Sequence, residues 1–253
     1  MFVTNRHKKL NFTIEDVYFC KDYREYPLSA DVTTFYNSPI DGPNSIEYHT
    51  LFVDLTKTEE ELLAGIRKSF RQLIRRTMDS EDVTFEYMQA APELVEEFVE
   101  YYDSFAQQKG LEPIRRDVVQ NTLYDKQVII GRAFDKITDA VANMKVYFTD
   151  EDRCALIYDV SAFRDFATPE ARNAYGAISK TFHYKSMLYF KQKGLTIYDQ
   201  GGVALEKHED RAGIDDYKMG FGGELRKEYI LYAGKGLIGK QMAEMYRKKN
   251  QDY

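Results

Sequence analysis

The sequence predicts a mixed α/β domain with a largely antiparallel sheet, and two observations carry this prediction. Three strand-like runs between residues 128 and 163 follow one another through short polar turns, a pattern typical of antiparallel hairpins. Segments with helical apolar periodicity, at 58–77, 92–110 and 168–193, lie before and after these runs. This order favours helices flanking one antiparallel sheet.

The composition is that of a globular protein with a substantial core. The chain has 253 residues, of which 43% are hydrophobic and 30% charged, enough for one large domain or one domain with an appendage. The first ten residues contain no apolar run of signal-peptide length, and no stretch reaches the roughly 18 apolar residues of a membrane span. We therefore expect a cytoplasmic protein. Cys20 and Cys154 lie far apart without a metal-binding pattern, so neither a disulfide framework nor a metal site is predicted.

The charge pattern argues against a protein whose whole surface binds polyanions. The net charge is -6, so DNA is not an expected partner. Residues 67–76 nevertheless carry five basic and no acidic side chains, whereas residues 93–103 carry five acidic and no basic ones. A local basic stripe suits one phosphate-bearing ligand, and a solvated helix face explains it equally well.

The first 90 residues divide into a lead-in and three elements. Residues 1–45 hold three of the six prolines and many turn-forming residues, which predicts an irregular lead-in before a single domain at 46–253. A strand is expected at 46–55 and another at 83–90. Between them, Thr58 and Glu61 have capping-box spacing and open a predicted helix with an apolar stripe.

The second half alternates long helices with strands. Pro92 begins a helix that Gly110 ends, and a shorter helix is expected at about 115–126. After the three strands, Thr168 and Pro169 have the character of an N-cap and first helical residue. Short strands at 195–200 and 228–233 and a basic amphipathic segment complete the chain.

Four stretches of the sequence form a recognisable set: 53–77, 98–114, "YDQGG" at 198–202 and "GIDDYKMGFGG" at 213–223. They resemble the GNAT-like domain of Fem-type transferases and related GNAT-fold N-acyltransferases, and the last two in tandem are the more specific. Fem-type enzymes attach amino acids from aminoacyl-tRNA to cell-wall precursors. They contain two tandem GNAT-like domains, whereas this chain has room for one complete copy.

The resemblance implies an N-acyl- or N-aminoacyltransferase without a tightly bound cofactor. The expected donor is aminoacyl-tRNA or acyl-CoA, and the expected acceptor is an amine such as an amino sugar or a cell-envelope glycan or peptidoglycan precursor. An acetyl-CoA-dependent GNAT N-acetyltransferase is the alternative, although residues 161–177 lack the glycine-rich turn that cradles a pyrophosphate. A third possibility is a GNAT-derived binding module without catalysis.

Three residues are candidates for the chemistry. Lys218 matches a lysine that the family places near the acyl linkage of the donor, where an ammonium stabilises an oxyanion or a phosphate. Asp199 is a candidate base for the acceptor amine, or a side chain that caps the following Gly-Gly turn. His208 is a candidate base in a polar loop. No Ser or Cys nucleophile is required, because a neutral amine attacks the donor directly.

Basic and aromatic residues supply the predicted binding groups. The chain contains 20 Tyr and 16 Phe but no Trp, and tyrosine suits clefts that hold sugars or bases, although most of these rings are expected in the core. The donor and phosphate candidates are Arg71, Arg75, Arg76, Arg164 and Arg172. The substrate-cleft candidates are Tyr101, Tyr102, Tyr158, Tyr175, Tyr217, Gly201 and Gly202.

Overall fold

A ten-stranded sheet forms the body of the protein. The computed structural model describes residues 3–9, 11–114, 116, 123, 127–161, 168–205 and 212–251. The strand order is β1-β2-β3-β10-β4-β9-β8-β7-β6-β5, and neighbours are antiparallel except in the pairs β2–β3 and β8–β9. The predicted fold class is therefore confirmed. The strands are β1 (Val3–Lys9), β2 (Phe12–Tyr18), β3 (Val32–Ser38), β4 (Ser45–Asp54), β5 (Val83–Gln89), β6 (Val128–Asp135), β7 (Ala140–Thr149), β8 (Arg153–Ser161), β9 (Ile197–Val203) and β10 (Glu224–Gly234).

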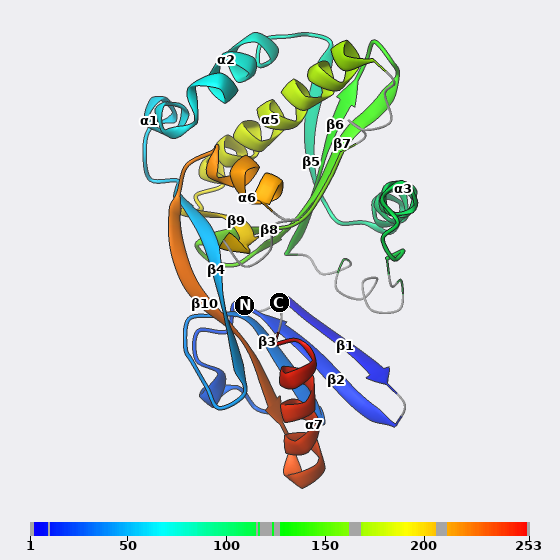
Figure 1. Ribbon diagram of the computed structural model, residues 1–253, viewed down its shortest axis with the longest axis vertical. Helices are drawn as coiled ribbons and strands as arrows, with labels where there is room; N and C mark the ends of the chain where they lie inside the picture. The colour runs from blue at the N-terminus through cyan, green and yellow to red at the C-terminus, as the bar shows by residue number, and fades with distance from the viewer. Residues whose placement is uncertain are drawn as a thin grey trace.

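Helices cover both faces of this sheet. Strand β7 shows the two layers, because Val146 packs into the core beneath α3 whereas Tyr147 packs into the core beneath α5. The long strands β4 and β10 connect this part to β1–β3 and α7 at the other end of the molecule (Figure 1). The helices are α1 (Glu59–Gly65), α2 (Lys68–Thr77), α3 (Pro92–Lys109), α5 (Pro169–Gln192), α6 (Ala212–Met219), α7 (Gly236–Lys249) and the short 3-10 helix η1 (Tyr23–Glu25).

The capping signals of the two long helices are confirmed. Pro92 occupies the first turn of α3, and Gly110 ends it in the left-handed conformation with φ 64°. The Thr168 side chain accepts a hydrogen bond from the amide of Ala171 at 3.2 Å, as an N-cap residue does. The predicted helix at 115–126 lies mostly outside the described residues.

The irregular lead-in predicted for residues 1–45 is wrong, because β1, β2 and β3 extend the main sheet through the β3–β10 pairing. Turn-forming residues cluster in the connections between these strands, and β1 carries a run of charged and polar side chains, "TNRHKK". Charged residues are common on edge strands, where they oppose pairing with another chain. The amino-acid composition of residues 1–45 therefore does not predict these three strands.

The single helix predicted from Thr58 is also corrected, since it is divided into α1 and α2. The Thr58–Glu61 capping box is present, but Ile66 adopts an extended ψ of 143°. The amide of Arg67 donates to the carbonyl of Gly220 at 2.8 Å instead of continuing the helix. A tertiary contact to residues 217–223, which contain the second of the two Gly-Gly pairs, thus replaces one helical turn.

Helix α6 occupies a part of the chain for which the sequence predicted a loop between two strands, so that expectation is wrong for Ala212–Met219. Its eight residues include Gly213 and two adjacent acids, which weakened the helical signal. In the described ranges, no helix is both long enough and apolar enough to cross a membrane.

Strand β2 contains a buried carboxylate that makes stability depend on pH. Burial raises the pKa of Asp16 to about 6, the hydrogen bond from Thr34 partly offsets this, and the nearby Glu15 adds to the rise. The folded state thus retains a proton that the unfolded chain releases, so stability falls as pH rises from about 4 to 6.

Asp16→Asn is therefore expected to raise the free energy of unfolding above pH 6 by up to about 3 kcal/mol and to change it little near pH 4. Urea unfolding across this pH range measures the difference. The exposed Asp79→Asn variant is the control. An equal gain at both ends of the range would contradict burial of the charged form as the cause.

Candidate active site

Strands β8 and β9 separate at the centre of the sheet. They form a parallel ladder over only three residue pairs, from Arg153–Ile197 to Ala155–Asp199. Beyond these pairs β8 stays with β7 and β9 stays with β4, so the two strands lose their mutual pairing. Backbone groups that leave a ladder in this way are available to pair with an extended ligand.

The first Gly-Gly pair lies at this separation. Gly201 has φ +82°, and a Cβ there would lie 3.0 Å from the carbonyl oxygen of Leu156 on β8. The amide of Gly201 also donates to Asp199 Oδ1 at 2.9 Å. A left-handed φ and this close approach both require glycine at position 201.

The second Gly-Gly segment packs against the first. Lys218 Nζ donates to the carbonyl of Gly202 at 2.5 Å, and Gln200 Nε2 donates to the carbonyl of Gly222 at 2.7 Å. Gly222 and Gly223 have φ of +76° and +107°, which turns the chain from α6 into β10. The structure therefore brings Asp199, Lys218 and both Gly-Gly pairs to one place.

A polar cluster that the sequence analysis missed is hydrogen-bonded to Tyr217, the residue before Lys218. Lys145 is fully buried and pairs with Asp159, whose side chain is 25% exposed. Asn143 Nδ2 donates to Asp159 Oδ1 at 3.1 Å and to Ser179 Oγ at 3.2 Å, and Ser179 Oγ shares a hydrogen bond of 3.0 Å with the hydroxyl of Tyr217. This chain of hydrogen bonds links β7 and β8 to the residue that precedes Lys218.

Burial controls the protonation of this cluster. It lowers the pKa of Lys145, although the Asp159 carboxylate opposes that shift, and it raises the pKa of Tyr217. His183 stacks on Phe221 with ring centroids 4.0 Å apart, and burial together with the positive charges of Lys145 and Lys218 drives its pKa well below the usual range. His183 is therefore a neutral residue of the core.

Asp199 is held in a buried charge network. Its side chain is 1% exposed; one oxygen accepts from Thr50 and Gly201, and the other pairs with Arg153. Arg153 also binds Glu228, at 2.6 Å, and burial opposes its charge, but the two carboxylates outweigh burial and raise the pKa of the guanidinium. This geometry favours the turn-holding role of Asp199 over that of a base facing the substrate.

The predicted arginines do not converge on one point. Arg71 donates to the carbonyls of Ala64 and Ile66 at 2.6 and 2.8 Å, so it ties the end of α1 to α2. Arg75 and Arg76 are exposed on α2, and Arg172 is exposed on the first turn of α5. Two further predicted site residues lie outside the described residues, Arg164 and His208.

The predicted tyrosines lie on both faces of the sheet. Three of them pack into the core beneath α3, namely Tyr101, Tyr102 and Tyr158. Tyr175 is a buried residue of α5 and shares a 2.9 Å hydrogen bond with Thr138 in the β6–β7 turn. Tyr217 precedes Lys218 in the chain, and its hydroxyl shares a hydrogen bond with Ser179 of the polar cluster.

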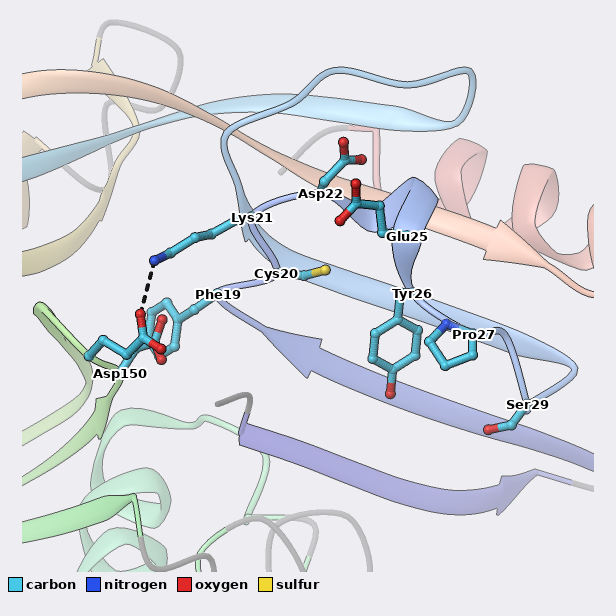
Figure 2. Close-up of a pocket in the computed structure, with 10 residues that line it drawn as sticks. Phe19, Cys20, Lys21, Asp22, Glu25, Tyr26, Pro27, Ser29 and Asp150 are labelled. Atoms are coloured by element: carbon cyan, nitrogen blue, oxygen red, sulfur yellow. Dashed lines mark hydrogen bonds and ion pairs between the residues drawn. The ribbon is translucent and has the colours of Figure 1, made fainter.

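A cavity lies away from this site, between η1 and the β7–β8 turn (Figure 2). It measures about 640 Å³ and is lined by aromatic and acidic side chains, and the Lys21–Glu151 ion pair of 3.2 Å joins its two sides. A second cavity of about 400 Å³ has Gly222 and Gly223 in one wall. The candidate site lies at the β8–β9 separation because Lys218 lies where these two strands no longer pair with each other.

Metal and thiol chemistry receive no support from the described part of the chain. In it, no group of three or more His, Cys, Asp or Glu side chains is arranged to hold a metal ion. Cys20 and Cys154 are buried free thiols. Burial raises the pKa of both, which disfavours the reactive thiolate.

The known proteins that match this chain resemble it in three-dimensional structure. No family model matches the sequence, and a search of curated proteins gives no match. FemX superposes with a TM-score of 0.60 at 12% identity over 81% of this chain, which spans just under two thirds (66%) of FemX.

Two further solved structures also superpose. The C-terminal domain (DUF2156) of a protein described as a lysylphosphatidylglycerol synthetase from Agrobacterium fabrum gives a TM-score of 0.55 at 13% identity, over 92% of this chain and 81% of that one. L-PGS from Bacillus licheniformis gives a TM-score of 0.53 at 12% identity, over 86% of this chain and 72% of that one. The chain thus has the Fem-type, GNAT-like fold that its sequence motifs led us to expect.

Proposed function

We propose that this protein is an N-aminoacyl- or N-acyltransferase that forms an amide bond at the separation of β8 and β9. The observation that carries the proposal is the position of Lys218, whose ammonium lies against Gly202 where the two strands lose their pairing. The fold likeness to FemX, to the Agrobacterium fabrum domain and to L-PGS supports a transferase of this type.

Amide formation at this site needs no covalent intermediate between the donor and the enzyme. A neutral amine attacks the carbonyl carbon of the donor, the C–N bond forms, and the negative charge moves to the carbonyl oxygen. Lys218 would stabilise that oxyanion, and the hydrogen bond to Gly202 fixes the direction of its ammonium. Collapse of the intermediate breaks the bond to the carrier, which leaves with its electron pair and gains the proton lost by the amine.

Aminoacyl-tRNA is the donor that we favour. Coenzyme A is commonly bound through its pyrophosphate at a helix N-terminus, where free backbone amides face the ligand. At the start of α5, Pro169 has no amide hydrogen, and the amide of Ala171 donates to Thr168. Two of the first three helical residues are therefore unable to hold a phosphate in this way.

Asp159 is our candidate for binding a cationic amine. Its carboxylate is partly exposed, and Lys145 and Asn143 hold it from the buried side. The α-ammonium of an aminoacyl donor suits this carboxylate. The acceptor class that we propose is an amino sugar or another amine-bearing cell-envelope precursor.

A transfer assay tests the proposal. The purified chain is incubated with a panel of amines and either aminoacyl-tRNA carrying labelled amino acids or labelled acetyl-CoA. We expect label from aminoacyl-tRNA to enter a product that survives mild alkali, because an amide persists where the donor ester hydrolyses. Transfer from acetyl-CoA alone would establish the alternative N-acetyltransferase.

Mass spectrometry of copurifying molecules provides an independent check on the donor. A charged tRNA supports the favoured donor, and a coenzyme A species would displace it. If neither donor supports transfer to any amine while a ligand still binds, the chain is a binding module with this fold.

A further inference from the structure

Helix α7 approaches the rest of the protein most closely at its smallest residues. Gly239 and Ala243 are buried in this contact. A Cβ on Gly239 would lie 2.3 Å from the carbonyl oxygen of Asp31, and one on Gly234 would lie 2.0 Å from the backbone of Gly239. The helix therefore lies directly on the backbone of β10 and of the β2–β3 connection, at the end of the molecule far from α2 and α5 (Figure 1).

Three large apolar side chains of α7 point away from the protein, whereas Tyr246 stacks on Tyr232. Leu237 is 76% exposed, Ile238 61% and Met245 69%. Residues 238 and 245 are seven apart, so they lie on one face, and residue 237 lies beside them. An amphipathic helix normally buries such residues, whereas α7 presents them to its surroundings.

Basic residues flank this apolar face. Between residues 235 and 249 the chain carries five Lys or Arg and one acid, Glu244, a net charge of +4 on a protein whose total is -6. Lys235, Lys240, Lys248 and Lys249 are exposed. An apolar strip with basic ends is the pattern of a helix that lies in the interface of an anionic bilayer.

We propose that α7 docks this protein onto membranes that contain anionic lipids, with Leu237, Ile238 and Met245 inserted between headgroups. A symmetric contact between two copies would place two helices of net charge +4 together, which opposes dimerisation through this face. RNA would pair with the basic residues but leave the apolar strip exposed to water. The proposal is independent of the proposed transferase activity.

The absence of tryptophan from the chain allows a direct test. In Met245→Trp the new indole is the sole tryptophan, and we expect its emission to shift to shorter wavelength with vesicles of phosphatidylcholine mixed with phosphatidylglycerol. Phosphatidylcholine alone should give no shift. Ile137→Trp, at a site 76% exposed in the β6–β7 turn, is the matched control and should not respond.

Flotation of the full chain with the same vesicles separates the apolar and charged contributions. We expect Leu237→Gln/Ile238→Gln and, separately, Lys240→Gln/Lys249→Gln each to lower vesicle binding about tenfold or more. Lys57→Gln/Lys193→Gln removes two exposed charges elsewhere and should bind as the wild type does. Circular dichroism verifies that each variant is folded.

Several results would overturn the proposal. They are a wild-type chain that does not float with anionic vesicles, an apolar variant that floats as well as the wild type, or an indole emission in Met245→Trp that does not shift. If instead Leu237→Gln/Ile238→Gln converts a dimer to a monomer in sedimentation, α7 is an interface between copies. If the lysine variant alone loses RNA binding and vesicles have no effect, α7 contacts RNA.

Discussion

Replacing Lys218 with alanine is expected to lower kcat for amide transfer by about 10²- to 10³-fold, with a smaller change in KM. Removing the ammonium takes away a donor that acts on the oxyanion, which exists in the transition state and not in the bound substrate. Lys218→Arg should retain part of the rate because it keeps a cation, although its shape differs. Steady-state kinetics with the donor that is active in the wild type measure the effect.

A matched lysine distinguishes catalysis from structure. Lys136 Nζ donates to the carbonyl of Glu81 at 2.7 Å, the same kind of hydrogen bond that Lys218 makes with Gly202, but in the β6–β7 turn. Lys136→Ala should therefore leave kcat unchanged. Both variants should melt within a few degrees of the wild type. Near-normal turnover by Lys218→Ala would remove Lys218 from the mechanism.

Replacing Arg153 with methionine is expected to destabilise the protein by about 3–5 kcal/mol. The change leaves the carboxylates of Asp199 and Glu228 buried, 1% and 7% exposed, without their cation. An uncompensated buried charge costs more than the ion pair itself contributes. Urea unfolding at pH 7 measures this loss.

Two further variants isolate the cause of that destabilisation. Arg226→Met removes an exposed pair with Glu224, 58% and 73% exposed, and should cost about 0–1 kcal/mol. Adding Asp199→Asn and Glu228→Gln to Arg153→Met should recover part of the stability because the charges are removed together. A cost below about 1 kcal/mol for Arg153→Met would mean that water or rearrangement compensates the carboxylates.

Local signals in the sequence predicted those parts of the fold that local interactions determine. The ends of α3 and α5 follow from Pro92, Gly110 and Thr168, whose effects act within one turn. The break between α1 and α2 does not follow from such signals. It depends on the bond from Arg67 to Gly220, a partner distant in sequence.

Sequence signals likewise predicted only part of the candidate site. The resemblance of the two Gly-Gly stretches to Fem-type motifs pointed to Lys218 and Asp199. The structure shows why glycine stands there, since Gly201, Gly222 and Gly223 have left-handed φ and close contacts. Asn143 and Lys145 gave a weaker signal, polar residues at alternating positions of an otherwise apolar strand. Their link to Asp159 and Tyr217 requires the strand register and the position of α5, which the sequence does not specify directly.

The most direct test of the account is a crystal structure of the complex with a 3′-aminoacylamino-3′-deoxyadenosine, an amide analogue of the end of an aminoacyl-tRNA. We expect the analogue between β8 and β9, with its carbonyl oxygen within hydrogen-bond distance of Lys218 Nζ and its α-ammonium near Asp159. An analogue bound in the cavity beside Phe19 and Asp150, or one that leaves Lys218 untouched, would contradict the account.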